Sequence, residues 1–187
     1  MKRYIKISIL LLFTLILFSL IYIASVCLPN VSGLDQVIQH AEPENRLDSV
    51  GVRDFIELAN EGSSTEGQIA RWLLLKSMFD RKYSNFSFQV QTLVLSWYLK
   101  IQYSEAEVFT LYASLFSHND IVGLNNFSLS QFKKPVSQLS DVETAELAVY
   151  LKSPNYFIKH SKRMVNLRDH ILDQYNKNKL QDTQQKL

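Results

Sequence analysis

The sequence has 187 residues, enough for one domain of ordinary size with an additional segment. Its formal net charge of +2 excludes the strongly basic composition typical of nucleic-acid-binding proteins, so we expect no nucleic-acid partner. The single cysteine, Cys27, excludes an intrachain disulfide and a cysteine-based metal cluster. The four histidines are scattered without the spacing of a zinc site, so we also expect no structural metal.

The first predicted element is an apolar segment at the N-terminus. Three basic residues within 1–6 precede an uncharged apolar run at 7–28. As a helix this run would be about 33 Å long, which is sufficient to cross the hydrocarbon core of a bilayer. A cleaved signal peptide is the alternative, but its apolar core usually has about 7–15 residues and ends in a small-residue site. We therefore predict an uncleaved transmembrane anchor, with the basic end in the cytoplasm.

Helical periodicity dominates the chain after this segment, and strand signals are rare. The segment 86–103 is apolar almost all round, which predicts a central buried helix or one that lies partly against lipid. Two capping-box patterns predict helix starts, one pairing Ser104 with Glu107 and the other pairing Ser140 with Glu143. These signals favour helices throughout the body of the chain.

The C-terminal part contains the last helix signals. Ser153–Pro154 predicts the end of one helix, because the residue before a proline avoids the helical conformation. The following segment is amphipathic, with inward-facing positions at Met164, Leu167, Ile171 and Leu172. A polar stretch comes after it, which we expect to be frayed or disordered.

Together these patterns predict an all-α protein with about six or seven helices behind a transmembrane helix. The sequence has no internal repeat and no glycine-rich nucleotide-binding loop. The predicted organisation is a basic N-terminus at 1–6, a transmembrane anchor at 7–28, a linker at 29–40, a helical domain at 41–175 and a polar tail at 176–187.

Three blocks of the predicted helical domain carry a resemblance to a known family. At 61–75 the chain reads "EGSSTEGQIARWLLL", which is similar to "GGSTITQQLAKNLFL". At 103–116 it reads "YSEAEVFTLYASLF", which is similar to "YSKDEILELYLNxxxF". The block at 122–157 is similar to "YGIEAAARxYFGKxxxxLTLAEAALLAALPxAPxxY". In this order the blocks resemble the peptidoglycan glycosyltransferases (glycosyltransferase family 51), found as monofunctional transglycosylases and in class A penicillin-binding proteins.

The resemblance implies a lysozyme-like helical fold beside the membrane and a role in bacterial peptidoglycan biosynthesis. The family polymerises lipid II, transferring a growing glycan from its undecaprenyl pyrophosphate to an acceptor sugar hydroxyl. That reaction needs a carboxylate to take the hydroxyl proton, and basic side chains or a divalent metal to stabilise the leaving pyrophosphate. It also implies a single-pass protein of the inner (cytoplasmic) membrane, with its domain in the periplasm.

The first family motif, E-D-x-x-F-x-x-H-x-G, aligns with "EPENRLDSVG". Glu42 stands at the glutamate, which the family uses as the general base, and Gly51 stands at the glycine. Pro43, Arg46 and Ser49 replace the aspartate, the phenylalanine and the histidine. The arginine would tend to hold Glu42 ionised and so make it a poorer base, unless the second glutamate of this stretch is its nearer partner.

The second motif, G-G-S-T-I-x-Q-Q with a lysine three residues later, is partly kept. The resemblance implies that Ser63, Gln68 and Arg71 bind substrate or phosphate, with the arginine keeping the positive charge of the lysine. Glu61 and Glu66 are additional acids in this stretch. Near a pyrophosphate they would repel the substrate.

The third motif, R-K-x-x-E, supplies two cations and a second carboxylate in the family. Ungapped alignment places Phe88, Gln89 and Thr92 at these positions, so all three charges are absent. Arg81–Lys82 would serve as a displaced pair only with a gap inside a helix. Asn125 likewise replaces the glutamate of the "GIEAAA" stretch. These four positions mark the site as degenerate.

Simpler structural explanations compete with the functional ones. We favour a solvated loop acid for Glu42 and an N-cap for Ser63. Arg71 fits the polar face of a helix, Asn125 fits a helix surface, and His118 fits a turn. The two tryptophans are either core residues or membrane-interface residues.

We therefore predict a degenerate, non-catalytic transglycosylase-like protein without a cofactor, which binds lipid II, peptidoglycan glycan or another cell-wall synthesis protein. The alternative is an active peptidoglycan glycosyltransferase with Glu42 as general base, and in that case a divalent metal would be expected. A third interpretation is a membrane-tethered helical interaction domain with no glycan ligand.

Overall fold

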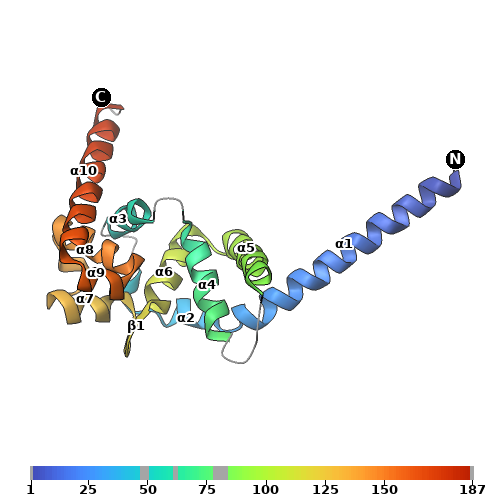
Figure 1. The fold of residues 1–187 in the computed structure, drawn as a ribbon, viewed down its shortest axis with the longest axis horizontal. Coiled ribbons are helices and arrows are strands. Elements are labelled where there is room, and N and C mark those ends of the chain that lie inside the picture. Colours follow the sequence, from blue (N-terminus) through green and yellow to red (C-terminus); the bar gives the residue numbers. More distant parts are fainter. Residues whose placement is uncertain (1, 47–50, 61–62, 78–83, 186–187) are drawn as a thin grey trace.

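A computed structural model describes residues 2–46, 51–60, 63–77 and 84–185. Its elements in chain order are α1 (Lys2–Val31), α2 (Leu34–Gln39), the 3₁₀ helix η1 (Pro43–Asn45), α3 (Val52–Ala59), α4 (Thr65–Ser77), α5 (Asn85–Gln102), α6 (Glu105–Leu115), β1 (Ser117–His118), β2 (Ile121–Val122), α7 (Leu124–Phe132), the 3₁₀ helix η4 (Val136–Gln138), α8 (Asp141–Lys152), α9 (Pro154–Lys159) and α10 (Ser161–Gln185). The all-α prediction is confirmed (Figure 1). In the described ranges, strand is confined to the antiparallel β1–β2 hairpin.

Helix α1 projects away from the body of the protein (Figure 1). Its 30 residues correspond to a length of about 45 Å. Large apolar side chains from Leu11 to Ile23 are 40–72% exposed, a surface that water does not favour. By its length and composition this helix can cross a membrane, in agreement with the predicted anchor. At its other end Val26 and Cys27 are buried, where α1 packs against α5 and α4.

The predicted helix starts are confirmed at both capping boxes. The Ser104 hydroxyl accepts a hydrogen bond from the Glu107 backbone N–H, and the Glu107 carboxylate accepts one from the Ser104 N–H at 2.8 Å. Ser140 and Glu143 repeat this arrangement at the start of α8. Each box satisfies backbone donors that a helix start otherwise leaves unpaired, which explains why α6 and α8 begin where they do.

Two groups of helices build the core: α3, α8 and α10 pack against one another, and so do α4, α5 and α6. In α10, Met164 and Ile171 are buried and Leu167 and Leu172 are half-buried, as the amphipathic pattern predicted. The expectation of a frayed or disordered tail is not met at 176–185, because α10 continues as a helix to Gln185.

Two further segments differ from the sequence-based expectation. The linker predicted at 29–40 contains the end of α1 and the short helix α2, whose Leu34 is buried. Short helices such as α2 and the six-residue α9 raise the helix number above the expected six or seven, because tertiary packing stabilises segments too short to be helical alone.

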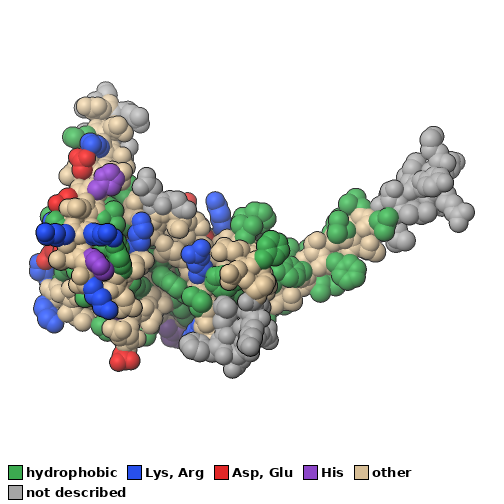
Figure 2. Space-filling view, viewed as in Figure 1, with side chains coloured by type: hydrophobic (Ala, Val, Ile, Leu, Met, Phe, Trp, Pro, Cys, Tyr) green, Lys and Arg blue, Asp and Glu red, His purple; other side chains and the backbone are tan. Residues whose placement is uncertain are grey.

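Helix α5 lies at the edge of the body rather than at its centre. Thr92, Leu95 and Leu99 are buried on one side. On the other side four large apolar side chains are 50–86% exposed, namely Phe86, Leu93, Trp97 and Ile101. Apolar side chains cover both α1 and the neighbouring α5 in Figure 2. Of the two predicted interpretations of this segment, a helix partly against lipid agrees better with this exposure.

Candidate functional site

The structure divides the predicted site residues into two groups. Glu42 contacts Asn125, whereas Ser63, Gln68 and Arg71 together line a pocket elsewhere. We call the first group, with Asn45 and Val136, the Glu42 corner. We call the second group, with the other residues of that pocket, the Arg71 pocket.

In the Glu42 corner, an asparagine connects three segments. The side-chain amide of Asn125 donates to Glu42 Oε2 at 3.4 Å, and its carbonyl accepts from the Val136 N–H at 3.2 Å. The Asn125 backbone N–H donates to Asn45 Oδ1 at 3.1 Å. Only 8% of Asn125 is exposed, so the expected helix-surface position is wrong. The neighbouring Asn126 is exposed and donates to the Val122 carbonyl at 2.9 Å.

Two glycines of the aligned blocks fit tight backbone positions at this end of the molecule. Gly123 precedes α7 with φ +90°, and a Cβ there would lie 3.4 Å from Asn45 Nδ2. Gly51 precedes α3 with φ +63°, and a Cβ there would lie 3.4 Å from the Tyr175 hydroxyl. L-residues with side chains rarely adopt such φ values, so both glycines are explained by the fold without any catalytic role.

Glu42 itself is exposed at the N-terminal end of η1. Arg46 is also exposed, and it makes no ion pair with Glu42 in the part of the chain that the structure describes. The carboxylate of Glu44 instead accepts a hydrogen bond from the Ser137 N–H at 3.1 Å. Ser49, at the histidine position of the first motif, lies outside the described residues. The exposure of Glu42 agrees with a solvated acid.

The Arg71 pocket has a volume of about 230 Å³. The described residues that line it are Asn60, Ser63, Gln68, Arg71, Trp72, Leu151 and Lys152. Gln68 Nε2 donates to Asn60 Oδ1 at 2.7 Å, which orients both amides. The three binding residues implied by the second motif therefore do lie together, and Lys152 of α8 adds a second cation.

Ser63 is not the N-cap that we favoured. The hydroxyl of Ser64 accepts a hydrogen bond from the Gly67 N–H at 3.1 Å, so Ser64 occupies the N-cap position of α4. Ser63 is exposed, and its backbone N–H donates to the Asn60 carbonyl. Its hydroxyl is thus left for the pocket rather than used by the helix.

A second pocket of about 390 Å³, here called the Arg53 pocket, shares Asn60 and Ser63 with the first. Its other described lining residues are Arg53, Glu57, Ser64, Thr65, Glu66, Glu105, Val108 and Phe109. Arg53 pairs with Glu57 at 3.2 Å and with Glu105, and its guanidinium lies 4.7 Å from the centre of the Phe109 ring. The hydrogen bond between Arg53 and Glu105 raises the pKa of the arginine and lowers that of the glutamate. The positive charge of Arg53 is therefore neutralised within this pocket by Glu57 and Glu105.

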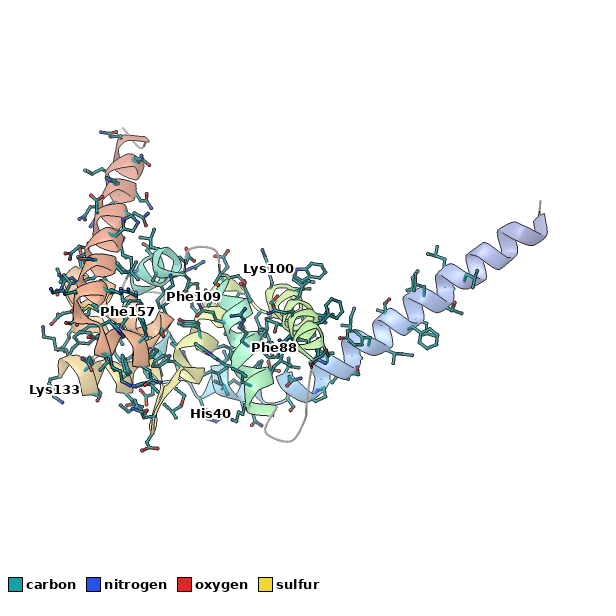
Figure 3. All side chains as sticks on the ribbon, viewed as in Figure 1. His40, Phe88, Lys100, Phe109, Lys133 and Phe157 are labelled. Atoms are coloured by element: carbon teal, nitrogen blue, oxygen red, sulfur yellow. The ribbon has the colours of Figure 1, made fainter. Side chains whose placement is uncertain are left out.

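The third-motif positions are on α5 and supply no charge. Phe88 is half-buried against the core on the helix that packs beside α4 (Figure 3). Thr92 is buried, and its hydroxyl donates to the Phe88 carbonyl at 2.8 Å. Gln89 is exposed. None of the three lines either pocket described above, and Arg81–Lys82 lies outside the described residues.

Other aromatic and imidazole side chains are structural. Trp72 is half-buried, with its ring 4.9 Å from that of Tyr112, whereas Trp97 is exposed on α5. His118 is buried against the edge of the Phe127 ring. Burial raises the pKa of Tyr112 well above its ordinary value. In the described ranges no group of three His, Cys, Asp or Glu residues is placed to hold a metal ion, so we derive no step through a metal.

Comparisons with known proteins agree with this architecture. The transglycosylase family matches residues 52–176, which is more than half of the chain. The protein therefore belongs to the transglycosylase family, and its fold is a lysozyme-like helical transglycosylase domain behind an N-terminal apolar helix.

A curated relative gives the more particular likeness. The chain is 27% identical over 136 residues to a biosynthetic peptidoglycan transglycosylase of Paraburkholderia xenovorans (strain LB400). That match covers 68% of this chain and 57% of the relative, so the chain spans little more than half the length of that protein. No solved structure matches. The chain is thus a peptidoglycan transglycosylase-like protein.

Sequence reasoning missed three residues of these sites. Lys152 lies in the last turn of α8, outside every motif, and only the packing of α8 near α4 shows that it accompanies Arg71. Asn60 and Asn45 are both about 95% buried, but a lone asparagine gives no sequence signal of burial.

Proposed function

We propose that this protein is a membrane-anchored, non-catalytic member of the transglycosylase family that serves bacterial peptidoglycan biosynthesis by binding. The observation that carries the proposal is the absence of charge at the third motif. On α5, Phe88 is half-buried against the core and Thr92 is buried, so no charged side chain stands there for the two cations and the second carboxylate that the reaction uses.

The separation of the remaining groups supports the same conclusion. A general base must lie within hydrogen-bond reach of the proton it removes, while the cations must reach the leaving pyrophosphate of the same substrate. Glu42 lines neither of the two pockets described above, and its described partner is the neutral amide of Asn125. Loss of one preorganised donor typically costs about 2.7–4 kcal/mol of transition-state stabilisation. Loss of two cations and a carboxylate would thus slow turnover by several orders of magnitude.

Polymerisation of lipid II tests this proposal. The full chain in detergent would be incubated with lipid II beside an active transglycosylase as positive control. We expect no glycan polymer above the level without protein. Polymer formation by the wild-type chain that disappears in Glu42→Gln would overturn the proposal and establish the active alternative with Glu42 as the base.

The ligand that we propose is lipid II, or the peptidoglycan glycan made from it, at the surface of the membrane. Family membership and the three motif residues gathered in the Arg71 pocket support this choice over an interaction domain with no glycan ligand. Binding of lipid II to the detergent-solubilised chain, without turnover, is the expected result. Failure to bind either lipid II or a moenomycin-type inhibitor would favour a protein partner of cell-wall synthesis instead.

We further propose that α1 anchors the chain in the inner membrane with the basic N-terminus in the cytoplasm and the domain in the periplasm. Two observations support anchoring: the exposed apolar surface of α1, and the exposed apolar side of α5 that packs beside it. The orientation follows from the basic residues that precede the apolar run. Protease added outside spheroplasts should digest the domain, and protection of the domain would reverse the orientation.

A further inference from the structure

We propose that the junction of α9 and α10 carries a docking surface for an acidic segment of another protein. The surface consists of Lys159, His160, Lys162 and Arg163, with Ile158 next to them, and we call it the basic junction. None of these residues lines the Arg71 pocket or the Arg53 pocket. This docking surface is therefore separate from the site of the proposed glycan ligand and does not depend on it.

The positive charge of the basic junction is local rather than a property of the whole chain. Three of the 20 basic residues precede the apolar run of α1, which leaves 17 basic against 18 acidic residues beyond it. No Asp or Glu occurs from 147 to 168, however, and the four titratable side chains of the basic junction are all exposed. Figure 2 shows Lys, Arg and His side chains gathered over this end of the body. A nearly neutral domain thus presents one positively charged surface, which attracts a partner of opposite charge.

Helix stability gives no reason for these cations to stand where they do. The helices α3, α4, α6 and α8 each have an acid in the first turn, where the helix dipole favours negative charge. Helix α10 has no acid in its first turn and carries Lys162 and Arg163 there instead. The three cations of the basic junction form no ion pair with any described residue, whereas Arg53 and Lys134 do. Their charges are therefore available to a partner.

An aromatic ring holds the polar side chains of the basic junction in place. The His160 ring stacks on that of Tyr156, with the ring centres 4.3 Å apart, and its Nδ1 lies 2.8 Å from the Tyr156 carbonyl oxygen. The Arg163 guanidinium donates to the Tyr156 hydroxyl and lies 5.7 Å from the centre of that ring. Tyr156 in turn packs edge-on against the buried Phe157, with the ring centres 5.1 Å apart. Side chains that are already ordered lose less entropy when a partner binds.

The position of the basic junction argues against a lipid surface as its partner. Figure 1 places α9 and the start of α10 at the end of the body opposite to α1. The bilayer that α1 can cross adjoins the other end, where the apolar side of the neighbouring α5 is exposed. The basic junction therefore faces away from that bilayer.

The extent and composition of the surface favour a protein segment over an acidic polysaccharide. A long polyanion such as a nucleic acid is bound by many cations that follow its backbone. Here the titratable side chains end at Arg163, and the next charged residues of α10, Arg168 and Asp169, pair with each other. Tyrosine and arginine beside an apolar side chain are typical of protein interfaces, and Ile158 is 49% exposed. The partner that we infer has carboxylates on both sides of an apolar residue.

A synthetic peptide tests this proposal directly. The probe is a short fluorescent peptide with several glutamates around a central leucine, titrated into the full chain in an uncharged detergent. We expect saturable binding by fluorescence anisotropy, and the affinity should fall as salt is raised, because the charges are exposed. The same peptide with glutamine in place of each glutamate should not bind. Absence of binding by the glutamate peptide would overturn the proposal.

Substitutions locate the binding surface. The test variant replaces the three cations of the basic junction by glutamine, and it should weaken peptide binding at least about tenfold, from roughly threefold for each exposed pair. The matched control removes the same total charge from three exposed lysines elsewhere, namely Lys76, Lys100 and Lys133. Lys162→Gln alone, a single exposed change, should weaken binding roughly threefold and guards against misfolding of the test variant. Equal losses in the test variant and the control would show attraction by net charge alone and overturn the proposal.

Three further titrations define the class of partner. Ile158→Ser keeps the charge and should weaken binding of the leucine peptide but not of a version with serine at its centre. Unchanged binding of the leucine peptide would indicate a simple polyanion site and overturn the inferred protein segment. Tighter binding of alginate or of phosphatidylglycerol vesicles than of the peptide, lost in the test variant, would overturn it in favour of a polysaccharide or a lipid. Lipid II binding should be equal in wild type and test variant, so the proposed function and the docking surface can fail separately.

Discussion

The Glu42 corner and the Arg71 pocket hold residues that the resemblance aligns with different motifs of one family, and the fold treats their polar groups differently. In the corner, Asn125 joins Glu42, Asn45 and Val136 in one hydrogen-bond network that holds η1, α7 and η4 together. In the pocket, Arg71 and Lys152 make no ion pair within the described part of the chain. The fold uses the polar groups of the corner in hydrogen bonds, whereas it leaves the two cations of the pocket without an ion pair in the described ranges.

This difference indicates which polar side chains the fold itself requires. A side chain that becomes part of the fold is retained for stability even when its chemistry is gone. Cations that contribute nothing to stability have no such reason to remain together. The contrast predicts that substitutions in the corner affect folding, whereas those in the pocket affect binding.

The largest expected effect is in the corner. Asn125→Ala leaves the buried Val136 N–H without its acceptor, so we expect the free energy of unfolding to fall by about 1–3 kcal/mol. Asn126→Ala is the control, because that side chain is exposed and should change stability by less than about 0.5 kcal/mol. Denaturant unfolding of both variants measures this. Equal destabilisation would show that the network is not what distinguishes the corner.

Acid should weaken an ion pair near the corner, between the segment that precedes η4 and the start of α8. The carbonyl of Lys134 accepts a hydrogen bond from the Ser128 hydroxyl, and its ammonium group pairs with Glu143 at 2.7 Å. This ion pair, together with the hydrogen bonds from Ser140, lowers the pKa of the Glu143 carboxyl from its ordinary 4.5 to about 2. A carboxyl with a lowered folded-state pKa contributes stability above its unfolded pKa and loses it as the pH falls.

As the pH falls from 4.5 to 2, the wild type should therefore lose the stability that the ionised Glu143 contributes. Glu143→Gln lacks this ionisable carboxyl, so its stability should change less over the same range. Because this pair is partly exposed, the difference should be no more than about 1 kcal/mol. Thermal unfolding of wild type and Glu143→Gln at several pH values measures it. Parallel curves across this window would mean that the ion pair does not stabilise the fold.

Beneath the Arg71 pocket, removal of a hydroxyl should cost nothing. The Tyr112 hydroxyl is buried, and it faces the Asn60 side chain without a well-aligned hydrogen bond. Its ring lies tilted against that of Trp72, with the ring centres 4.9 Å apart. Tyr112→Phe should leave stability unchanged or raise it by up to about 1 kcal/mol. Tyr103→Phe makes the same chemical change but removes a 2.9 Å hydrogen bond to Asp35, so its effect should be of opposite sign. Destabilisation by both would assign the Tyr112 hydroxyl a partner.

The smallest effects belong to the pocket cations. Arg71→Gln and Lys152→Gln should each change the free energy of unfolding by less than about 0.5 kcal/mol, because both side chains are exposed and contribute no ion pair within the described ranges. Thermal unfolding without ligand measures this. A loss above about 1 kcal/mol would mean that the pocket, like the corner, is retained for folding.

Much of the fold was predictable, because its signals are local. The capping boxes at Ser104 and Ser140 and the stop at Ser153–Pro154 depend on residues a few positions apart, and the structure confirms them. The inward face of α10 followed from helical periodicity. The position of α5 was left open, because an all-round apolar helix does not show which side is covered.

The sites were less predictable, because their partners are distant in the chain. Asn125 was expected on a surface, but the partner of its N–H is Asn45, 80 residues earlier. Lys152 belongs to no motif, and its proximity to the second-motif residues depends on how α8 packs. Alignment correctly grouped Ser63, Gln68 and Arg71, because one loop and one helix carry all three.

The burial of Cys27 has a practical consequence. The only thiol of the chain is 2% exposed, so the folded wild type should react slowly with maleimide reagents. A cysteine introduced at the position of Trp97 or Lys152 would then be the single fast-labelling site. Each variant can carry a spin label or fluorophore without replacement of Cys27. A label at position 97 would report on depth in the bilayer, and a label at position 152 would report on occupancy of the Arg71 pocket.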